Sequence, residues 1–509
     1  MIIFRASPFT YCNVETCGCI MSTMTDPHTM YQSPFTARWS RNSPLMKLFS
    51  DQNRIFTWRQ LWSWLGEAQV ELGIGNITNE QVGLMRAHLH DIDWSYARER
   101  EAQTRHDVMA HIDTFEHVCG LNGVVHLGAT SCFVQDNTDI ILMRDALLHV
   151  RTQLIECVRC LADFATRHKH TATVGRTHYQ VASMTTVGKR ACIWLQSLVI
   201  AYRDVEHALG EIKFRGCKGA TGTQDSFLFL CGGDATKVDR LDKRVTELAG
   251  FPDTHRYTVT GQTYDRMLDV IVLNALSTIG VAVNKCCMDI RMAQANGELR
   301  EPFETDQVGS SAMPYKRNPM RSERCCGLAR YLMSLPANAM QTAAMQGFER
   351  TLDDSANRRI VLPDAFLTAD ALLTTYLNIV NGLDVQAEAT ASIVSAELPF
   401  LALEKILMRC TQLGVGRQEA HEQIRKVSLA AAERRQRGDK VDLKSMIESE
   451  PNAFPASVRQ YAAELAQQNA LSFTGRCVQQ VEEYISNEVK PILVKHSNSK
   501  NAVNAKLDV

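Results

Sequence analysis

The stretch that decides the fold runs from residue 136 to residue 161 and reads DNTDIILMRDALLHVRTQLIECVRCL. Its apolar side chains recur at alternating steps of three and four residues, at Ile140, Met143, Leu147, Val150, Leu154, Cys157 and Leu161. This spacing places them along one face of an α-helix of about six turns. Asp136, Asn137 and Thr138 are candidates for its N-cap. The pattern therefore predicts a long helix that packs against other helices.

Two later stretches have a similar periodicity. Between Tyr264 and Asn296 apolar residues lie nearly all round the expected helix, which is typical of a helix buried on several sides. A further series comprises Phe366, Ala369, Leu373, Tyr376 and Val380. Gly382 then favours a helix stop. Proline breaks helix interiors, and none occurs between Pro44 and Pro252. Strand-like alternation is scarce, so the sequence predicts an all-α fold with a central bundle of long helices.

The length predicts more than one structural unit, because 509 residues exceed what one hydrophobic core usually serves. We expect three domains with boundaries near 130 and 385. An N-terminal helical domain covers 31–130, the bundle covers 131–385, and a more polar helical domain covers 386–509. Residues 1–30 are expected to be a disordered extension, because they resemble neither a secretory signal nor an Arg-rich transit peptide.

Charge and hydropathy exclude two classes of partner. The chain has 55 Lys and Arg against 56 Asp and Glu, a formal net charge of -1, without blocks of like charge. A nucleic-acid binder would show a basic patch, so we expect no nucleic-acid partner. The longest uncharged apolar stretch, Val270 to Asn284, is shorter than a membrane span. We therefore expect this stretch to be a buried helix, and no membrane partner.

The 16 cysteines are scattered, mostly within apolar helical stretches. Cys157 and Cys160 have the CxxC spacing of half a metal or redox site, but they lie within the heptad pattern, which favours small buried apolar residues. Cys12, Cys17 and Cys19 have no partner pattern after them. Reduced thiols and the lack of a signal predict a cytoplasmic protein.

The segment from Gly309 to Pro319, GSSAMPYKRNP, carries the most chemical information. Its glycine, paired serines and two prolines cannot continue a helix, so it is a loop. A serine-rich turn with a helix cap would explain it, with Ser311 fitting the cap better than Ser310. A mobile loop whose N–H groups, hydroxyl and Lys316 ammonium close over an anion would explain it equally well.

A histidine lies in a polar turn at Thr177-His-Tyr-Gln180. Because imidazole titrates near neutral pH, His178 could deliver a proton to a leaving group. A satisfied surface histidine fits the same residues. Arginines at several positions suit two-pronged recognition of carboxylate or phosphate, although a solvated helix face is the default for any one of them.

The loop resembles the GSSxMPxKxN signature of the fumarase/aspartase superfamily, whose members cleave C–N or C–O bonds and release fumarate. The longer string SSAMPYKRNPMRSERC is most similar to members that act on succinyl-purine nucleotides. Further similar segments lie between about Ser33 and Arg476: RHDVMAH at 105–111, LGATSC at 127–132, THYQ at 177–180, KGATGTQ at 218–224, GQTY at 261–264, FERTLDDSANRR at 348–359 and SFTGR at 472–476. The departures are Val181, where the family usually has proline, and the extra N-terminal segment.

The resemblance implies an elimination without cofactor or metal. A proton leaves the carbon beside a carboxylate, and the purine-bearing nitrogen then departs and is protonated, so the site needs a base, an acid and cations for carboxylates and phosphate. It also implies a homotetramer with a helical core, in which each active site combines residues from three subunits.

By the same resemblance, Ser310 is the general base and His178 the general acid. His106 orients the substrate or assists proton transfer, while His111 is structural. Lys316 faces a succinyl carboxylate. Glu323 orients His178 or pairs with Arg324. The implied substrate-binding residues are Arg38, Trp39, Arg105, His106, Asp107, Thr130, Ser131, Gln262, Asn318, Arg324, Arg350, Ser355 and Arg359. At Trp39 the family commonly has tyrosine, so stacking persists but a hydroxyl is lost.

Two alternatives stay open. Argininosuccinate lyase, fumarase and aspartase are relatives within the superfamily, but their substrates lack the phosphate that the arginine set suits. An inactive structural protein of the same fold, like the lens crystallins related to argininosuccinate lyase, is the other. It is disfavoured because Ser310, Lys316, His178 and His106 are all present.

Overall fold

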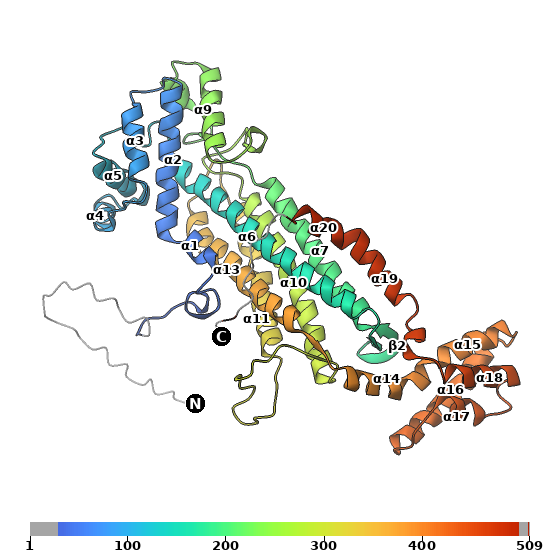
Figure 1. Cartoon of the computed structure of the whole chain (residues 1–509). Helices are drawn as coiled ribbons and strands as arrows, with labels where there is room; N and C mark the ends of the chain where they lie inside the picture. The colour runs from blue at the N-terminus through green and yellow to red at the C-terminus, as the bar shows by residue number, and fades with distance from the viewer. Residues whose placement is uncertain (1–28, 498–506, 508–509) are drawn as a thin grey trace, which may run out of the picture.

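Five long helices lie side by side in the middle of the molecule (Figure 1). The computed structural model describes residues 29–497 and residue 507. The five helices are α6 (Ser131–Arg167), α7 (Val187–Glu211), α10 (Met267–Ala295), α11 (Met320–Ser334) and α13 (Asp353–Gly382). Their apolar faces form one large core, so the fold is all-α with a central bundle.

Helix α6 contains the predicted seam. Each of the seven seam residues, from Ile140 to Leu161, is at most 1% exposed, because α7 and α13 pack against this face. The predicted cap was wrong, however. The helix starts earlier, with Thr130 as its N-cap, and Asp136, Asn137 and Thr138 are buried inside it. Asp136 and Asn137 instead bind the backbone of other segments, as with Asp136 and the N–H of Tyr264 at 2.9 Å.

Smaller elements surround the bundle. At one end lie α1 (Pro44–Leu48), α2 (Asp51–Glu71), α3 (Asn79–Ala87), α4 (Trp94–Thr104), α5 (Asp107–Cys119), α8 (Asp225–Leu230) and α9 (Ala235–Leu248) (Figure 1). A π-helical turn, η2 (Phe35–Trp39), precedes α1, and α12 (Pro336–Ala344) follows α11. Two antiparallel pairs, β1 (Ala172–Thr177) with β2 (Gln180–Thr186) and β3 (Leu299–Arg300) with β4 (Asp384–Val385), are the strands of the described residues.

The C-terminal part has a core of its own. It contains α14 (Ala387–Leu401), α15 (Leu403–Gln412), α16 (Arg417–Gln436), α17 (Leu443–Glu448) and α18 (Ala456–Leu465), which project from the far end of the bundle (Figure 1). The chain then returns, and α19 (Cys477–Tyr484) and α20 (Lys490–Lys495) pack along the bundle. The domain boundaries near 130 and 385 stay a prediction. Nearly all of the predicted extension, residues 1–28, and its three cysteines lie outside the described residues.

Two bundle helices are long and apolar. The apolar stretch at 270–284 extends into the 29-residue α10, and by length and composition alone α10 and α13 could both cross a membrane. Of their most apolar windows, however, 61% and 78% are buried inside the protein. They are therefore the core helices that the all-round apolar pattern predicts. Cys157 and Cys160 are likewise free and buried in α6, as expected for small apolar residues.

Candidate active site

The signature loop joins β3 to α11 and is closed at its base. The side-chain amide of Asn318 donates to the Gly309 carbonyl at 3.0 Å. A Cβ atom at Gly309 would lie 2.1 Å from the Lys316 carbonyl oxygen, so only glycine permits this approach. The two ends of the segment 309–318 are thus held together, and the residues between them project from the bundle.

Inside the loop, Ser310 has partners that suit a base. Its Oγ accepts hydrogen bonds from the N–H groups of Ala312 at 3.3 Å and Met313 at 3.1 Å. Two N–H dipoles aimed at one oxygen favour negative charge on it. Neither serine caps a helix, because Pro319 is the N-cap of α11 and the Ser310 hydroxyl closes a turn inside the loop. Lys316 lies further along the loop and is exposed, and Glu323, at the start of α11, ion pairs with Arg291 at 3.8 Å.

Near this loop lies a group of cations. Arg38 and Trp39 belong to η2, which is anchored by the buried Phe35 against Tyr331 of α11, with ring centroids 6.0 Å apart. Burial, together with the positive charge of Arg38, lowers the pKa of the Arg324 guanidinium.

His178 stands at the tip of the β1–β2 hairpin. Thr177 pairs with Gln180, so His178 and Tyr179 form a two-residue turn. Both have positive φ, 51° and 62°, a conformation that turns of this kind usually assign to Asn or Gly. Both side chains are exposed. The predicted polar turn is confirmed, and its backbone strain is of the kind found at functional sites.

The first strand of the hairpin is held by Glu298, which follows α10. Glu298 is 2% exposed and ion pairs with Arg176 at 2.5 Å and Arg190 at 3.2 Å. A cavity of about 620 Å³ opens beside His178, between the hairpin, α7, α10 and the 474–480 segment. Lys189, Lys285, Asp289 and Arg476 are among the residues that line it. Lys285 is ion paired with Asp289, and Arg476 with Glu483.

At the opposite end of α6, a third group meets around the start of α5. His106 is the N-cap of α5 and its Nε2 lies 3.5 Å from the Ser131 hydroxyl. Thr130 and Ser131 begin α6, and Arg105 precedes His106 with an exposed side chain. Burial alone would raise the pKa of the Asp107 carboxyl, but hydrogen bonds from Arg359, at 2.8 Å, and a backbone N–H hold it below its ordinary value.

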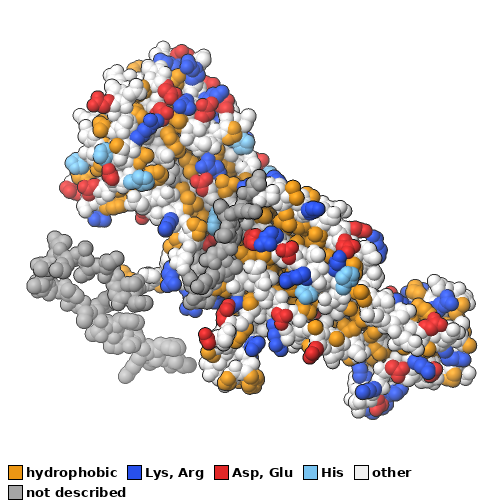
Figure 2. Space-filling model, viewed as in Figure 1, with side chains coloured by type: hydrophobic (Ala, Val, Ile, Leu, Met, Phe, Trp, Pro, Cys, Tyr) orange, Lys and Arg blue, Asp and Glu red, His pale blue; other side chains and the backbone are white. Residues whose placement is uncertain are grey.

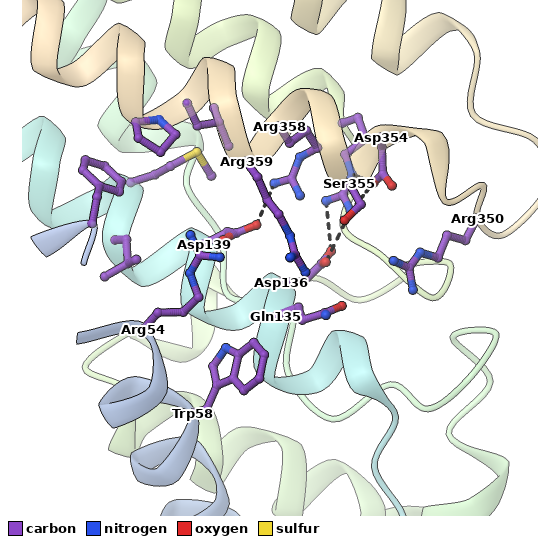
Figure 3. Close-up of a pocket in the computed structure, with 16 residues that line it drawn as sticks. Arg54, Trp58, Gln135, Asp136, Asp139, Arg350, Asp354, Ser355, Arg358 and Arg359 are labelled. Carbon is purple, nitrogen blue, oxygen red and sulfur yellow. Dashed lines mark hydrogen bonds and ion pairs between the residues drawn. The ribbon is translucent and has the colours of Figure 1, made fainter. Parts of the chain in front are cut away.

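Gln262 and Arg350 complete this third group. The Arg350 guanidinium donates to the Gln262 side-chain oxygen at 2.8 Å, and the Gln262 N–H donates to the Glu349 carbonyl at 3.1 Å. Ser355 lies in the first turn of α13, and Arg359 follows one turn later. Figure 3 shows Arg350, Ser355 and Arg359 on the wall of one cavity.

That cavity also has walls that the sequence did not predict. They include Arg54 and Trp58 of α2 and Asp139 of α6. Nε of Arg54 and Nε1 of Trp58 are buried without a hydrogen-bond partner among the described residues. No motif marks these residues. The available signal was the spacing of four residues between Arg54 and Trp58, which places them on one face of a helix.

The structure therefore brings the predicted site residues into three groups, not one. Ser131 lies at the start of α6 and the His178 hairpin follows its end, so a rise of 1.5 Å per residue separates them by about 55 Å. Within one chain, His178 cannot reach His106. Among the described residues no group of three or more His, Cys, Asp or Glu side chains could hold a metal ion.

Known proteins share this fold and this sequence. The family described as Lyase matches residues 33–333. The solved structure of a fumarate lyase from Mesorhizobium sp. BNC1 has a TM-score of 0.75 at 19% identity, covering 90% of this chain and 100% of that one. A 3-carboxy-cis,cis-muconate lactonizing enzyme from Pseudomonas putida also has a TM-score of 0.75, at 20% identity, covering 88% of this chain and 97% of that one. At these identities the likeness shows the fold alone.

Curated relatives are far more similar in sequence. Adenylosuccinate lyase of Caenorhabditis briggsae is 48% identical over 480 residues, which cover 94% of this chain and 99% of the relative. Adenylosuccinate lyase of Saccharomyces cerevisiae is 45% identical over 483 residues, with the same two shares. The matched family and these relatives define a lyase of the fumarate-releasing class. Within that class, the chain belongs to the adenylosuccinate lyase family.

The buried histidines near the site generate a prediction about pH. His111 is 8% exposed and lies edge-on to the rings of Trp58 and Trp94, and its Nδ1 atom has no hydrogen-bond partner in the part of the chain that the structure describes. Burial lowers the pKa of His111 to about 4, and that of His126 also to about 4. Between pH 6.5 and 4 the unfolded chain therefore binds more protons than the folded one. The free energy of unfolding should fall as the pH drops through this window.

We expect His111→Phe to weaken that pH dependence by about 1 kcal/mol per pH unit between pH 6 and 4.5, because one buried titrating group is removed while an aromatic ring still fills the site. Urea unfolding at several pH values measures this. An unchanged slope would show that His111 does not titrate in this window.

Proposed function

We propose that this protein releases fumarate from adenylosuccinate to give AMP, and from the related imidazole ribotide SAICAR to give AICAR. Membership in the adenylosuccinate lyase family supports the reaction and substrate. The observation that carries the chemistry is the environment of Ser310, whose Oγ accepts hydrogen bonds from two backbone N–H groups of the signature loop.

In the proposed mechanism, Ser310 removes the proton from the carbon beside the succinyl carboxylate. The electron pair left on that carbon is delocalised into the carboxylate, where Lys316 offsets the second negative charge. Serine is a weak base in water, so the N–H groups of Ala312 and Met313 and the exclusion of water must stabilise its alkoxide. Asn318 holds the loop closed at Gly309.

The carbon–nitrogen bond then breaks. Its electron pair goes to the purine-bearing nitrogen, and His178 supplies the proton that makes this nitrogen a neutral leaving group. The new double bond forms between the two succinyl carbons, which gives fumarate. His106, next to Ser131, orients the substrate or assists proton transfer, and Glu323 orients the acid in the assembled site.

The phosphate is assigned to the group at the start of α13. Arg350, Ser355 and Arg359 line one cavity there, and Arg350 has no carboxylate partner among the described side chains. A phosphate dianion suits two guanidinium groups and a hydroxyl. The remaining substrate contacts are proposed for Arg38, Trp39, Arg105, Asp107, Thr130, Gln262 and Arg324.

A single chain cannot assemble this site, because the groups with His178 and His106 lie at opposite ends of α6. We therefore assign the active form to a homotetramer in which three subunits contribute to each site. Apolar side chains exposed on the bundle, such as Ile200 at 55% and Val281 at 53%, support contact between copies. The 13 described cysteines are all free, which supports the cytoplasm as the compartment.

The first prediction of this proposal concerns the phosphate. Removal of the 5′-phosphate from adenylosuccinate should lower kcat/KM. The transition state should lose several kcal/mol of binding free energy, about the sum of two charge-assisted hydrogen bonds. The measurement compares turnover of the nucleotide with that of its dephosphorylated nucleoside, followed by ultraviolet absorbance. Equal efficiency would refute the phosphate assignment and reopen the other lyases of the superfamily.

A second prediction separates base from acid. Ser310→Ala and His178→Ala should each lose about 10²–10⁴-fold in kcat while retaining substrate binding. The near-neutral limb of the pH–rate profile should disappear only in the histidine variant. The control is Ser311→Ala, which should stay close to the unmodified enzyme. If Ser310→Ala retains near-normal turnover instead, the base has been assigned to the wrong serine.

The third prediction tests the shared site. His178→Ala and Ser310→Ala proteins, each inactive alone, should regain activity when their subunits are mixed and exchanged. Random exchange should restore up to about one quarter of the sites, because those sites draw both residues from unmutated copies. Each variant denatured and refolded alone must stay inactive. Hybrids that form without regaining activity would mean that both residues come from one chain.

A further inference from the structure

Behind Ser355 and Arg359 lies a buried network of ions that the proposed mechanism does not use. Its centre is Arg266, which precedes α10 and whose side chain is 2% exposed. The guanidinium binds Asp136 of α6 at 3.0 Å and Asp354 of α13 at 2.7 Å. One planar group therefore fixes the start of α10 to two other helices (Figure 3 shows the two carboxylates).

A second arginine, on α13, binds carboxylates on the other two helices. Arg358 of α13 binds Asp269 of α10 at 2.7 Å and Asp139 of α6 at 3.0 Å. The Tyr264 hydroxyl donates to the other oxygen of Asp269 at 2.7 Å. The helices α6, α10 and α13 are thus joined twice by arginines within one turn of α13.

These contacts flank the residues assigned to phosphate. Asp354 immediately precedes Ser355, and Arg358 immediately precedes Arg359. The N-cap of α13, Leu352, offers no side-chain hydrogen bond to the first turn. The direction of this turn is consequently set by the two arginine pairs, since no capping side chain fixes it.

Stability alone does not account for such a network. Taking ions out of water has a penalty that their attraction often only offsets, so apolar residues of similar volume would hold three helices together at least as well. What two-pronged arginine pairs add is a fixed geometry. Burial would raise the pKa of Asp136, but Arg266 and Arg358 outweigh it and hold the carboxyl ionised.

We infer that Arg266 and Asp354 are positioning residues, which orient the first turn of α13 so that Ser355 and Arg359 meet the phosphate of the substrate. The inference rests on the proposed function and deepens it. It requires that disturbing the pair affects substrates with a phosphate and leaves substrates without one nearly unaffected.

The test uses two conservative variants on opposite sides of one ion pair, Asp354→Asn and Arg266→Lys, in the full-length enzyme. Each should lower kcat/KM for adenylosuccinate about tenfold or more, through KM, while kcat/KM for the dephosphorylated nucleoside changes less than about threefold. AMP binding should weaken by a similar factor and adenosine binding should not, which gives a readout without turnover. Thermal unfolding identifies a variant that fails to fold. In that case the kinetics of the other variant decide whether the ion pair positions the phosphate-binding residues.

The matched control is Asp370→Asn. Asp370 is also a buried carboxylate of α13, 4% exposed, and accepts hydrogen bonds from His149 and Gln153. It lies 16 residues, or about 24 Å, further along the helix, and should leave the ratio of nucleotide to nucleoside efficiency unchanged. A parallel fall for both substrates in Asp354→Asn and Arg266→Lys would overturn the positioning role. Equal efficiencies in the unmodified enzyme would instead refute the phosphate assignment itself.

Discussion

The backbone hydrogen bonds of α6 hold 37 residues at a fixed rise, and the layout of the whole molecule depends on this rigidity. The helix is buried along the seam from Ile140 to Leu161, so it can neither bend nor shorten without opening the core. His106 lies beside one end of α6 and the hairpin with His178 follows the other end. Because no motion within one chain brings these ends together, the proposed mechanism requires the association of chains.

The apolar seams set the approximate arrangement of the helices. The exact positions of the hairpin and of the helix ends depend on buried ion pairs. Glu298 ties the hairpin of His178 to the end of α10, and Arg266 ties the start of α10 to α6 and α13. Both groups are buried, where an unpaired charge would be strongly unfavourable. Each therefore permits few arrangements of the segments around it. Ion pairs of this kind occupy both ends of α10, next to two different parts of the proposed site.

The sequence predicted the long helices because a seam of seven residues leaves few alternatives to a helix. It placed the cap of α6 wrongly, because Asp136 and Asn137 suit a cap as well as they suit a buried link to another segment. In the structure Asp136 forms such a link, because it accepts a hydrogen bond from the N–H of Tyr264. Composition alone indicated the signature loop and the polar turn, while the roles of their residues and the choice of arginines came from resemblance. Arg54, Trp58 and the Arg266 network were not, because their partners come from helices far apart in sequence. The separation into three groups likewise requires the length of α6 in three dimensions.

The turn between β1 and β2 has an unfavourable backbone conformation. His178 and Tyr179 occupy left-handed backbone conformations that Asn-Gly would adopt with less strain. Each such residue is destabilising by about 1 kcal/mol or more. A sequence selected for folding alone would have replaced them. Under the proposed mechanism the turn is therefore a place where stability and activity oppose each other, and the most stable version of this protein would be one that had lost the proposed proton donor.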